Sequence, residues 1–112
     1  MTQTQTSTIA NGQSLSSAIS MQNGFRPVAL VLPSTFDGTK ITFQVSLDGS
    51  TWSNLRLAFG QSQELDTEAA AGAAVRIEWF PTWPKAFRIR SGTAASATNQ
   101  TADRALTVVF EN

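Results

Sequence analysis

The clearest pattern in the chain lies at residues 41–55, which read ITFQVSLDGSTWSNL. Apolar residues alternate with polar ones from Ile41 to Leu47, and this period is typical of a strand with one buried and one solvent-facing side. An Asp-Gly turn signal follows at 48–49, and a second short strand carries Trp52 and Leu55. Because these two residues differ in parity, the turn or a bulge must re-aim one of them. The hairpin predicts an antiparallel all-β protein.

Strand signals also occur at residues 13–21, 25–32, 75–79, 87–91 and 106–110. The run at 25–32 is apolar on both faces, which predicts a central strand covered on both sides. Pro27 lies near its start and must sit where the sheet needs no backbone donor. Turn signals separate these segments at intervals of about 8–12 residues. We therefore predict an antiparallel β-sandwich of about eight short strands, jelly-roll-like in arrangement.

The shared alternation predicts which side chains fill the core of this sandwich. Burial of a large apolar side chain contributes roughly 1.5–3 kcal/mol, which drives the two sheets together. The side chains that we expect to be buried are Ile41, Phe43, Val45, Leu47, Ile77, Ile89, Leu106 and Val108.

The first residues differ in composition from the rest. Residues 1–8 read MTQTQTST and contain no charged side chain, no Gly and no Pro. Thr favours extended backbone, but so polar a run buries too little to offset roughly 1–2 kcal/mol of backbone entropy per residue. We divide the chain into an extended N-terminal arm (1–8) and a single β-sandwich domain (9–112). We expect the arm to be disordered alone and to contact another chain through Thr2, Gln3, Thr4, Gln5 and Thr6.

Low charge sets this chain apart from an average soluble domain. Charged residues make up 14% of the 112 residues, against roughly 25% usually, and eight basic residues balance eight acidic ones. A neutral chain has no general attraction to nucleic acid or an anionic membrane, and no apolar run approaches the length of about 18 residues that spans a membrane. Arg88 and Arg90 share one strand face, where we expect them to pair with acids on neighbouring strands. Weak self-repulsion favours association, so the composition suits an assembled subunit.

The residue types needed for most catalysis are missing. The chain has no His, no Cys and no Tyr, which removes the commonest general base, the thiolate nucleophile and the usual zinc ligands. No G-x-S-x-G elbow and no Gly-rich phosphate loop occur. Asp66 and Glu68 are spaced as a carboxylate pair, but solvated loop charges are the favoured interpretation. Asp37 and Asp48 lack the dense pattern of a calcium loop. We predict a protein that is not an enzyme and that uses no metal or cofactor.

Aromatic residues are the remaining candidates for binding. We expect Trp52, which follows the hairpin turn, to pack in the core. Trp79, Phe80 and Trp83 surround two prolines that stiffen the backbone of this segment. If exposed, these aromatics would stack on sugar rings or fill a pocket on a partner subunit. The alternative is that they plug the open end of the core.

Six short segments follow one another after the arm: 14–19 (SLSSAI), 32–36 (LPSTF), 41–46 (ITFQVS), 48–52 (DGSTW), 87–93 (FRIRSGT) and 99–104 (NQTADR). In this order they resemble the small β-sandwich structural proteins of tailed bacteriophages, of the head decoration (cement) or head-fibre type. The resemblance covers most of the chain after residue 13 and brings no catalytic motif with it. It does not include the Thr/Gln arm.

The resemblance implies a non-enzymatic virion protein on the capsid exterior, which decorates or cements the shell by binding across subunits of the major capsid protein. It also implies self-association, with a trimer expected because decoration proteins often sit on local threefold axes. Nucleic acid and membrane are not expected partners. The alternative is a carbohydrate- or receptor-binding β-sandwich module of a phage fibre or of a secreted protein. Binding to empty capsids, compared with binding to glycans, separates the two functions.

Overall fold

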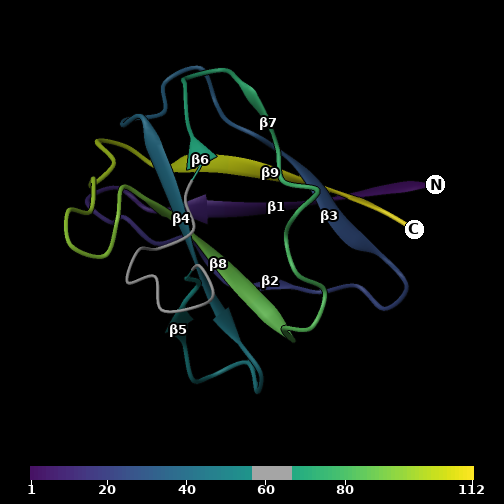
Figure 1. Cartoon of the computed structure of the whole chain (residues 1–112). Helices are drawn as coiled ribbons and strands as arrows, with labels where there is room; N and C mark the ends of the chain where they lie inside the picture. Colours follow the sequence, from purple (N-terminus) through teal and green to yellow (C-terminus); the bar gives the residue numbers. More distant parts are fainter. Residues whose placement is uncertain (57–66) are drawn as a thin grey trace.

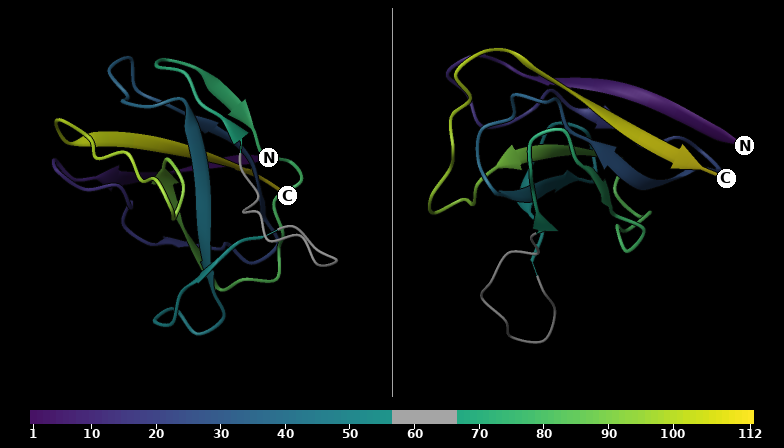
Figure 2. Two further views of the ribbon diagram at one scale, coloured as in Figure 1. Left: turned by 60° about the vertical axis from the view of Figure 1, so that its left-hand side comes forward. Right: turned by 90° about the horizontal axis from the view of Figure 1, so that it is seen from above.

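The computed structural model describes residues 1–56 and 67–112, which form two antiparallel sheets and contain no helix (Figure 1). The first sheet has the strand order β1 (Thr2–Ile9), β9 (Arg104–Glu111), β3 (Arg26–Val31) and β7 (Ala74–Arg76). The second has the order β2 (Ile19–Ser20), β8 (Ala86–Ser91), β4 (Lys40–Ser46) and β5 (Ser53–Asn54), and β6 (Thr67–Glu68) also pairs with β4. The two sheets lie one over the other (Figure 2). The predicted all-β antiparallel sandwich is confirmed.

The strand order is that of a jelly roll. Along the chain, β1 to β4 alternate between the first and second sheet, and β8 and β9 again lie in opposite sheets. Each sheet therefore interleaves strands from the two halves of the chain, as two Greek keys require. β5 and β6 both pair with β4 and together fill one strand position. In this strand order the first and last strands of the chain, β1 and β9, lie side by side (Figure 1).

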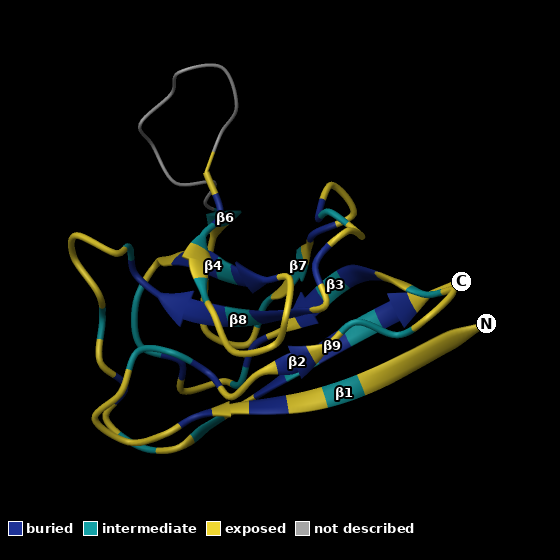
Figure 3. Ribbon diagram, turned by 90° about the horizontal axis from the view of Figure 1, so that it is seen from below, coloured by how far each residue is buried: buried dark blue, intermediate teal, exposed yellow. Residues whose placement is uncertain are grey.

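The core lies between the sheets and contains almost all the side chains that the alternation predicts. The confirmed members are Ile41, Phe43, Val45, Ile77, Ile89, Leu106 and Val108. The rings of Phe80 and Phe87 add an aromatic cluster, with centroids 4.6 Å apart. Figure 3 shows that β4, β8, β3 and β9 all contain buried segments. Hydrophobic burial across this interface is the main term that holds the sheets together.

The hairpin contains two differences from the sequence prediction. Leu47 is 74% exposed, because β4 ends at Ser46 and Leu47 already belongs to the turn. Trp52 is only half-buried and lies outside the core, with the Arg88 guanidinium carbon 4.2 Å from its ring centroid. Leu55, not Trp52, is the apolar residue after the turn that is buried. The turn therefore re-aims one of the two apolar residues, as their parity predicts.

The predicted strand at residues 13–21 is mostly a connection. Only β2 is regular there, while Leu15 forms an isolated bridge with Arg90 and Ser16 forms one with Ile9. The segment therefore passes between the edge of the first sheet and the edge of the second. It cannot run along either sheet over its whole length, because it is anchored to both.

β3 is central in its sheet, between β9 and β7, but it is not covered on both sides. Val28 and Leu30 face the core, whereas Ala29 is half-buried and Val31 is 39% exposed. The pairing of β3 with β9 shifts register between Pro27 and Ala29. Such an irregularity is where a proline is tolerated within a sheet.

The N-terminal arm is extended, as predicted, but its partner is β9 of the same chain. Eight residue pairs connect the two strands, from Thr2 opposite Glu111 to Ile9 opposite Arg104. Ile9 is fully buried, and the buried Ser7 hydroxyl donates to the Ser17 carbonyl at 2.7 Å. Backbone pairing and these anchors offset the ordering entropy that led us to expect a disordered arm.

A polar network joins two loops at one end of the sandwich. The Gln100 side chain is 1% exposed; its Oε1 accepts the Asp37 N–H at 2.9 Å and its Nε2 donates to the Asp37 carbonyl at 2.8 Å. Asp37 Oδ2 accepts the Thr101 N–H at 2.9 Å and Arg104 Nη2 at 3.2 Å. Chiefly through the Thr101 hydrogen bonds, these contacts hold the pKa of the Asp37 carboxyl below its usual value.

Candidate functional site

The first candidate is the outer edge of β1, which contains the arm residues predicted to bind a partner. Backbone N–H and C=O groups of successive strand residues point to opposite edges. The Thr8 carbonyl accepts the Ser17 N–H at 3.1 Å, so the polar backbone groups of Thr8 point away from β9. Counting back in steps of two residues, the backbone groups that also point outward belong to Thr2, Thr4 and Thr6.

Within the described ranges, no segment hydrogen-bonds to the outward backbone groups of residues 2–6. Gln5 is half-buried and its amide donates to the Ser20 carbonyl at 2.9 Å, whereas the other side chains of residues 2–6 are exposed. The pairing of β1 with β9 has no bulge, and residues 2–6 include no charge and no proline. Bulges, charged side chains and prolines are what proteins use to protect a sheet edge from pairing, and this edge has none of them at residues 2–6. This exposed edge, prominent in Figure 3, is therefore open to a strand from another chain.

The three aromatics of the proline-rich segment have separate roles. Phe80 is 3% exposed and packs on Phe43 and Phe87, so it plugs the core. Trp79 is 44% exposed and rests one ring edge against Phe43, with centroids 5.7 Å apart. Trp83 is 60% exposed. Phe80 therefore fits the interpretation that this segment plugs the core. Of the three aromatics, the two tryptophans remain available to a ligand or partner.

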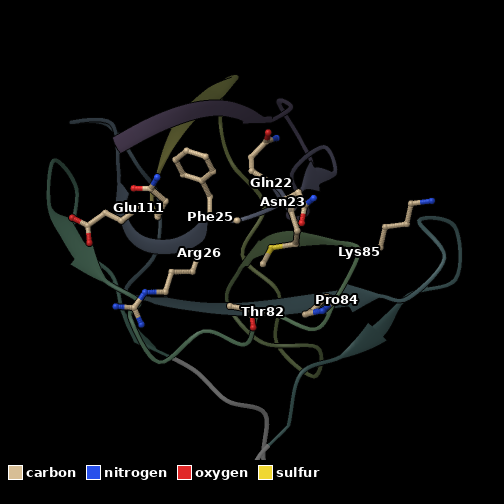
Figure 4. Close-up of a pocket in the computed structure, with 11 residues that line it drawn as sticks. Gln22, Asn23, Phe25, Arg26, Thr82, Pro84, Lys85 and Glu111 are labelled. Atoms are coloured by element: carbon tan, nitrogen blue, oxygen red, sulfur yellow. The ribbon is translucent and has the colours of Figure 1, made fainter. Parts of the chain in front are cut away.

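A hollow of about 500 Å³ lies on one side of the 82–85 segment (Figure 4). It is bounded by the β2–β3 turn, residues 21–26, and by Glu111 and Asn112. Figure 4 shows the charged ends of Arg26 and Lys85 pointing away from each other, on opposite sides of the hollow. Recognition of a charged ligand needs polar groups that converge on one point. This hollow does not provide them.

A second hollow, of about 410 Å³, lies beside the β4–β5 hairpin. The Lys85 N–H donates to the Ser46 carbonyl at 2.8 Å and thereby ties the 82–85 segment to the hairpin. Trp83 and the hairpin turn line the same hollow. The lining residues are Val45, Leu47, Asp48, Thr51, Ser53 and Trp83. An exposed indole, an exposed Leu and several oxygen-bearing side chains therefore share one concave surface.

Asp48 is the fixed polar group of this second hollow. Its Oδ1 accepts the Thr51 N–H at 2.7 Å, the Ser50 N–H at 2.8 Å and the Ser46 hydroxyl at 3.0 Å. The backbone donors of Thr51 and Ser50, in that order, hold the pKa of the Asp48 carboxyl far below its usual value. Gly49 completes the turn with a φ of 88°, a conformation that favours glycine. The carboxylate is therefore ionised and immobile at neutral pH.

Arg88 and Arg90 share one face of β8, as predicted, and this face lies opposite the core residues Phe87 and Ile89, but it is not open to solvent. Arg90 is 5% exposed and Arg88 is half-buried. Arg88 Nη2 donates to Gln44 Oε1, and Arg90 Nη2 donates to Asn54 Oδ1 at 2.9 Å. Burial, together with the charge of Arg90, lowers the pKa of the Arg88 guanidinium. With Trp52 packed on Arg88, these side chains cover part of the outer face of the second sheet.

The structure describes only one member of the candidate carboxylate pair. Asp66 lies outside the described residues, and its expected neighbour Glu68 is exposed on β6. Among residues 1–56 and 67–112, no group of three or more His, Cys, Asp or Glu side chains is placed to hold a metal ion. The same ranges contain no helix long and apolar enough to cross a membrane.

Sequence reasoning found Trp83 but missed its surroundings. The alternation of β4 predicts that Leu47 is buried, although this residue directly precedes the Asp-Gly turn. A residue in that place belongs to the turn and is free to point outward. The contact between the hairpin and the 82–85 segment has no local signal, because it joins residues far apart in the chain.

Comparison with known proteins does not add a family to this description. No protein-family model, no curated protein and no solved structure matches the chain. A jelly roll by itself is compatible with many functions, so function must be argued from the surfaces described above.

Proposed function

We propose that this protein is a non-enzymatic virion protein that decorates or cements a phage capsid from the outside, binding across subunits of the major capsid protein. The observation that carries the proposal is the free outer edge of β1 at residues 2–6. Such an edge binds an extended segment through main-chain hydrogen bonds and so needs no pocket. A neighbouring capsid subunit or a sister copy that presents an extended arm would supply that strand.

The composition and architecture support this proposal. A chain with 14% charged residues and equal numbers of acids and bases repels its own copies weakly. We include a homotrimer in the proposal because of the resemblance to phage decoration proteins. Each edge offers few hydrogen bonds, but a shell presents many equivalent sites and an oligomer engages several at once. Effective concentration then converts weak single contacts into stable attachment.

The test is a Thr4→Pro variant. It removes a backbone donor that points away from β9, so the β1–β9 hydrogen bonds are kept. We expect the variant to bind empty capsids of the co-encoded major capsid protein roughly tenfold more weakly in cosedimentation, since it loses a hydrogen bond of about 0.5–1.5 kcal/mol and gains a steric block. Thr4→Val is the matched control, because it changes the same side chain but keeps the N–H.

Two measurements decide the outcome. Circular dichroism and thermal melting must show that the Thr4→Pro variant keeps the β-sandwich. If a folded Thr4→Pro protein decorates capsids as tightly as the Thr4→Val control, the edge is not the attachment surface and the proposal fails.

A further inference from the structure

We propose that the hollow between the β4–β5 hairpin and Trp83 is a carbohydrate-binding site that takes one sugar ring through its apolar face and its hydroxyl groups. The proposal does not rest on a capsid role, because the described residues that line the hollow belong to β4, β5, the turn between them and the 82–85 segment. The edge of β1 belongs to the other sheet, so both surfaces are available at the same time.

The apolar side of the site is unusually exposed. Leu47 is 74% and Trp83 is 60% exposed, and both line the same hollow. In the described ranges no aromatic ring stacks on Trp83, in contrast to Trp79, which packs against Phe43. A sugar presents a flat C–H face that covers an indole, and this burial stabilises the complex. Single exposed apolar side chains are common on protein surfaces, but two large ones that line the same hollow indicate a binding surface.

The polar side of the site contains oriented oxygens. Asp48 stands at the rim with its carboxylate fixed by three donors to Oδ1, and Thr51 and Ser53 add hydroxyl groups. A carboxylate accepts hydrogen bonds only, so it selects a ligand that donates them, such as a sugar hydroxyl, and rejects a phosphate or a carboxylate. Because the turn holds Asp48 in place before binding, little entropy is lost when the ligand arrives.

The size of the hollow agrees with a small ligand. Its volume of about 410 Å³ lies near the lower end of the range for small-molecule sites, roughly 300–1,000 Å³. One tryptophan and a few hydrogen bonds predict weak binding, with a Kd of about 1 mM for a single ring. Useful attachment to a glycan-covered surface would then come from many copies acting together.

The experiment is a titration of the ¹⁵N-labelled full chain with methyl glycosides of glucose, galactose, mannose and N-acetylglucosamine, followed by amide and indole chemical shifts. We expect at least one glycoside to shift the signals of Trp83, Leu47 and Thr51 and to saturate. Trp83→Ala should weaken that binding roughly tenfold, as expected for the loss of one aromatic stacking contact. Trp79→Ala is the matched control, because it removes an exposed tryptophan outside the hollow, and we expect its affinity to be unchanged.

Thermal melting of both variants separates a lost contact from a lost fold. Tetramethylammonium is titrated in parallel, because an aromatic ring beside a carboxylate also attracts organic cations. Three results would overturn the proposal: no shift with any glycoside at concentrations well above the expected Kd, sugar binding that a folded Trp83→Ala variant retains, or shifts at Trp83 with the cation alone.

Discussion

At the scale of single residues, Gln100 shows how one buried side chain connects distant parts of the chain. Its amide makes two hydrogen bonds to the Asp37 backbone, and its Oε1 also accepts Arg104 Nε at 3.3 Å. A buried amide is stable only when its donors and acceptor are satisfied. These bonds join the β3–β4 loop to the β8–β9 loop and thus fix one end of the sandwich.

We expect Gln100→Ala to lower the free energy of unfolding by about 1–3 kcal/mol, because the Asp37 N–H loses its partner in a partly buried place. Urea denaturation at neutral pH measures this. The matched control is Asn99→Ala, which changes the exposed amide next to it. Equal stabilities of the two variants would show that the network is dispensable.

At the scale of elements, β1 is the strand whose position matters most for both stability and attachment. Its inner edge pairs with β9 along all eight residues, whereas among the described residues the backbone of its outer edge is paired only at Thr8 and Ile9. β1 therefore stabilises the fold through its inner edge and leaves its outer edge open. Its contributions to stability and to attachment can be measured separately.

Deletion of residues 2–8 should destabilise the protein, contrary to what the sequence alone suggests. The deletion removes several β1–β9 hydrogen bonds, at roughly 0.5–1.5 kcal/mol each, and the hydrogen bond from the Ser7 hydroxyl to the Ser17 carbonyl. Differential scanning calorimetry should show a clear fall in Tm. The Thr4→Pro variant, which keeps the inner ladder, should melt close to the unchanged protein. A truncated chain with an unchanged Tm would mean that β1 is not part of the cooperative unit.

At the scale of the whole molecule, local patterns could be predicted and long-range ones could not. The alternation in β4, β8 and β9 directly encodes the buried faces, so Phe43, Ile89 and Val108 were found. The alternation misplaces Leu47 because a turn changes the phase of the pattern, and the composition of β1 predicts a free arm because its partner strand lies at the other end of the chain. Of the candidate site, the sequence predicts the exposure of Trp83 as one of two alternatives. Its hollow depends on tertiary contacts that have no signal in the sequence.

The stability of the whole molecule should be insensitive to mild changes in pH and should fall in acid. The chain contains no His, so no imidazole titrates near neutrality. The pKa values of Asp37, Asp48 and Glu78 are all lowered in the folded state, first by hydrogen bonds from Thr101, Thr51 and Arg76 respectively. The unfolded chain, with Asp near its ordinary value of 3.8, then binds more protons in acid. This stabilisation is present above about pH 4 and is lost as the pH falls further.

Urea midpoints measured from neutral pH down to pH 2 test this expectation. Asp48→Asn should flatten the acid limb of the curve, because one of the three carboxyls then no longer titrates. A midpoint that rises as the pH falls below 4 would contradict the sign that we derive.

The pairing of β1 with β9 also sets how the molecule responds to mechanical force. Thr2 lies opposite Glu111, and the Met1 amine donates to Asn112 Oδ1 at 3.2 Å, so both chain ends leave the sandwich at the same place. Tension between the two ends would peel the strands apart, because it loads one hydrogen-bonded pair at a time. Tension applied along β1 by a strand bound to its outer edge would instead shear the ladder and load all its pairs together. The protein should therefore be mechanically weak when pulled by its ends and resistant when pulled through its edge.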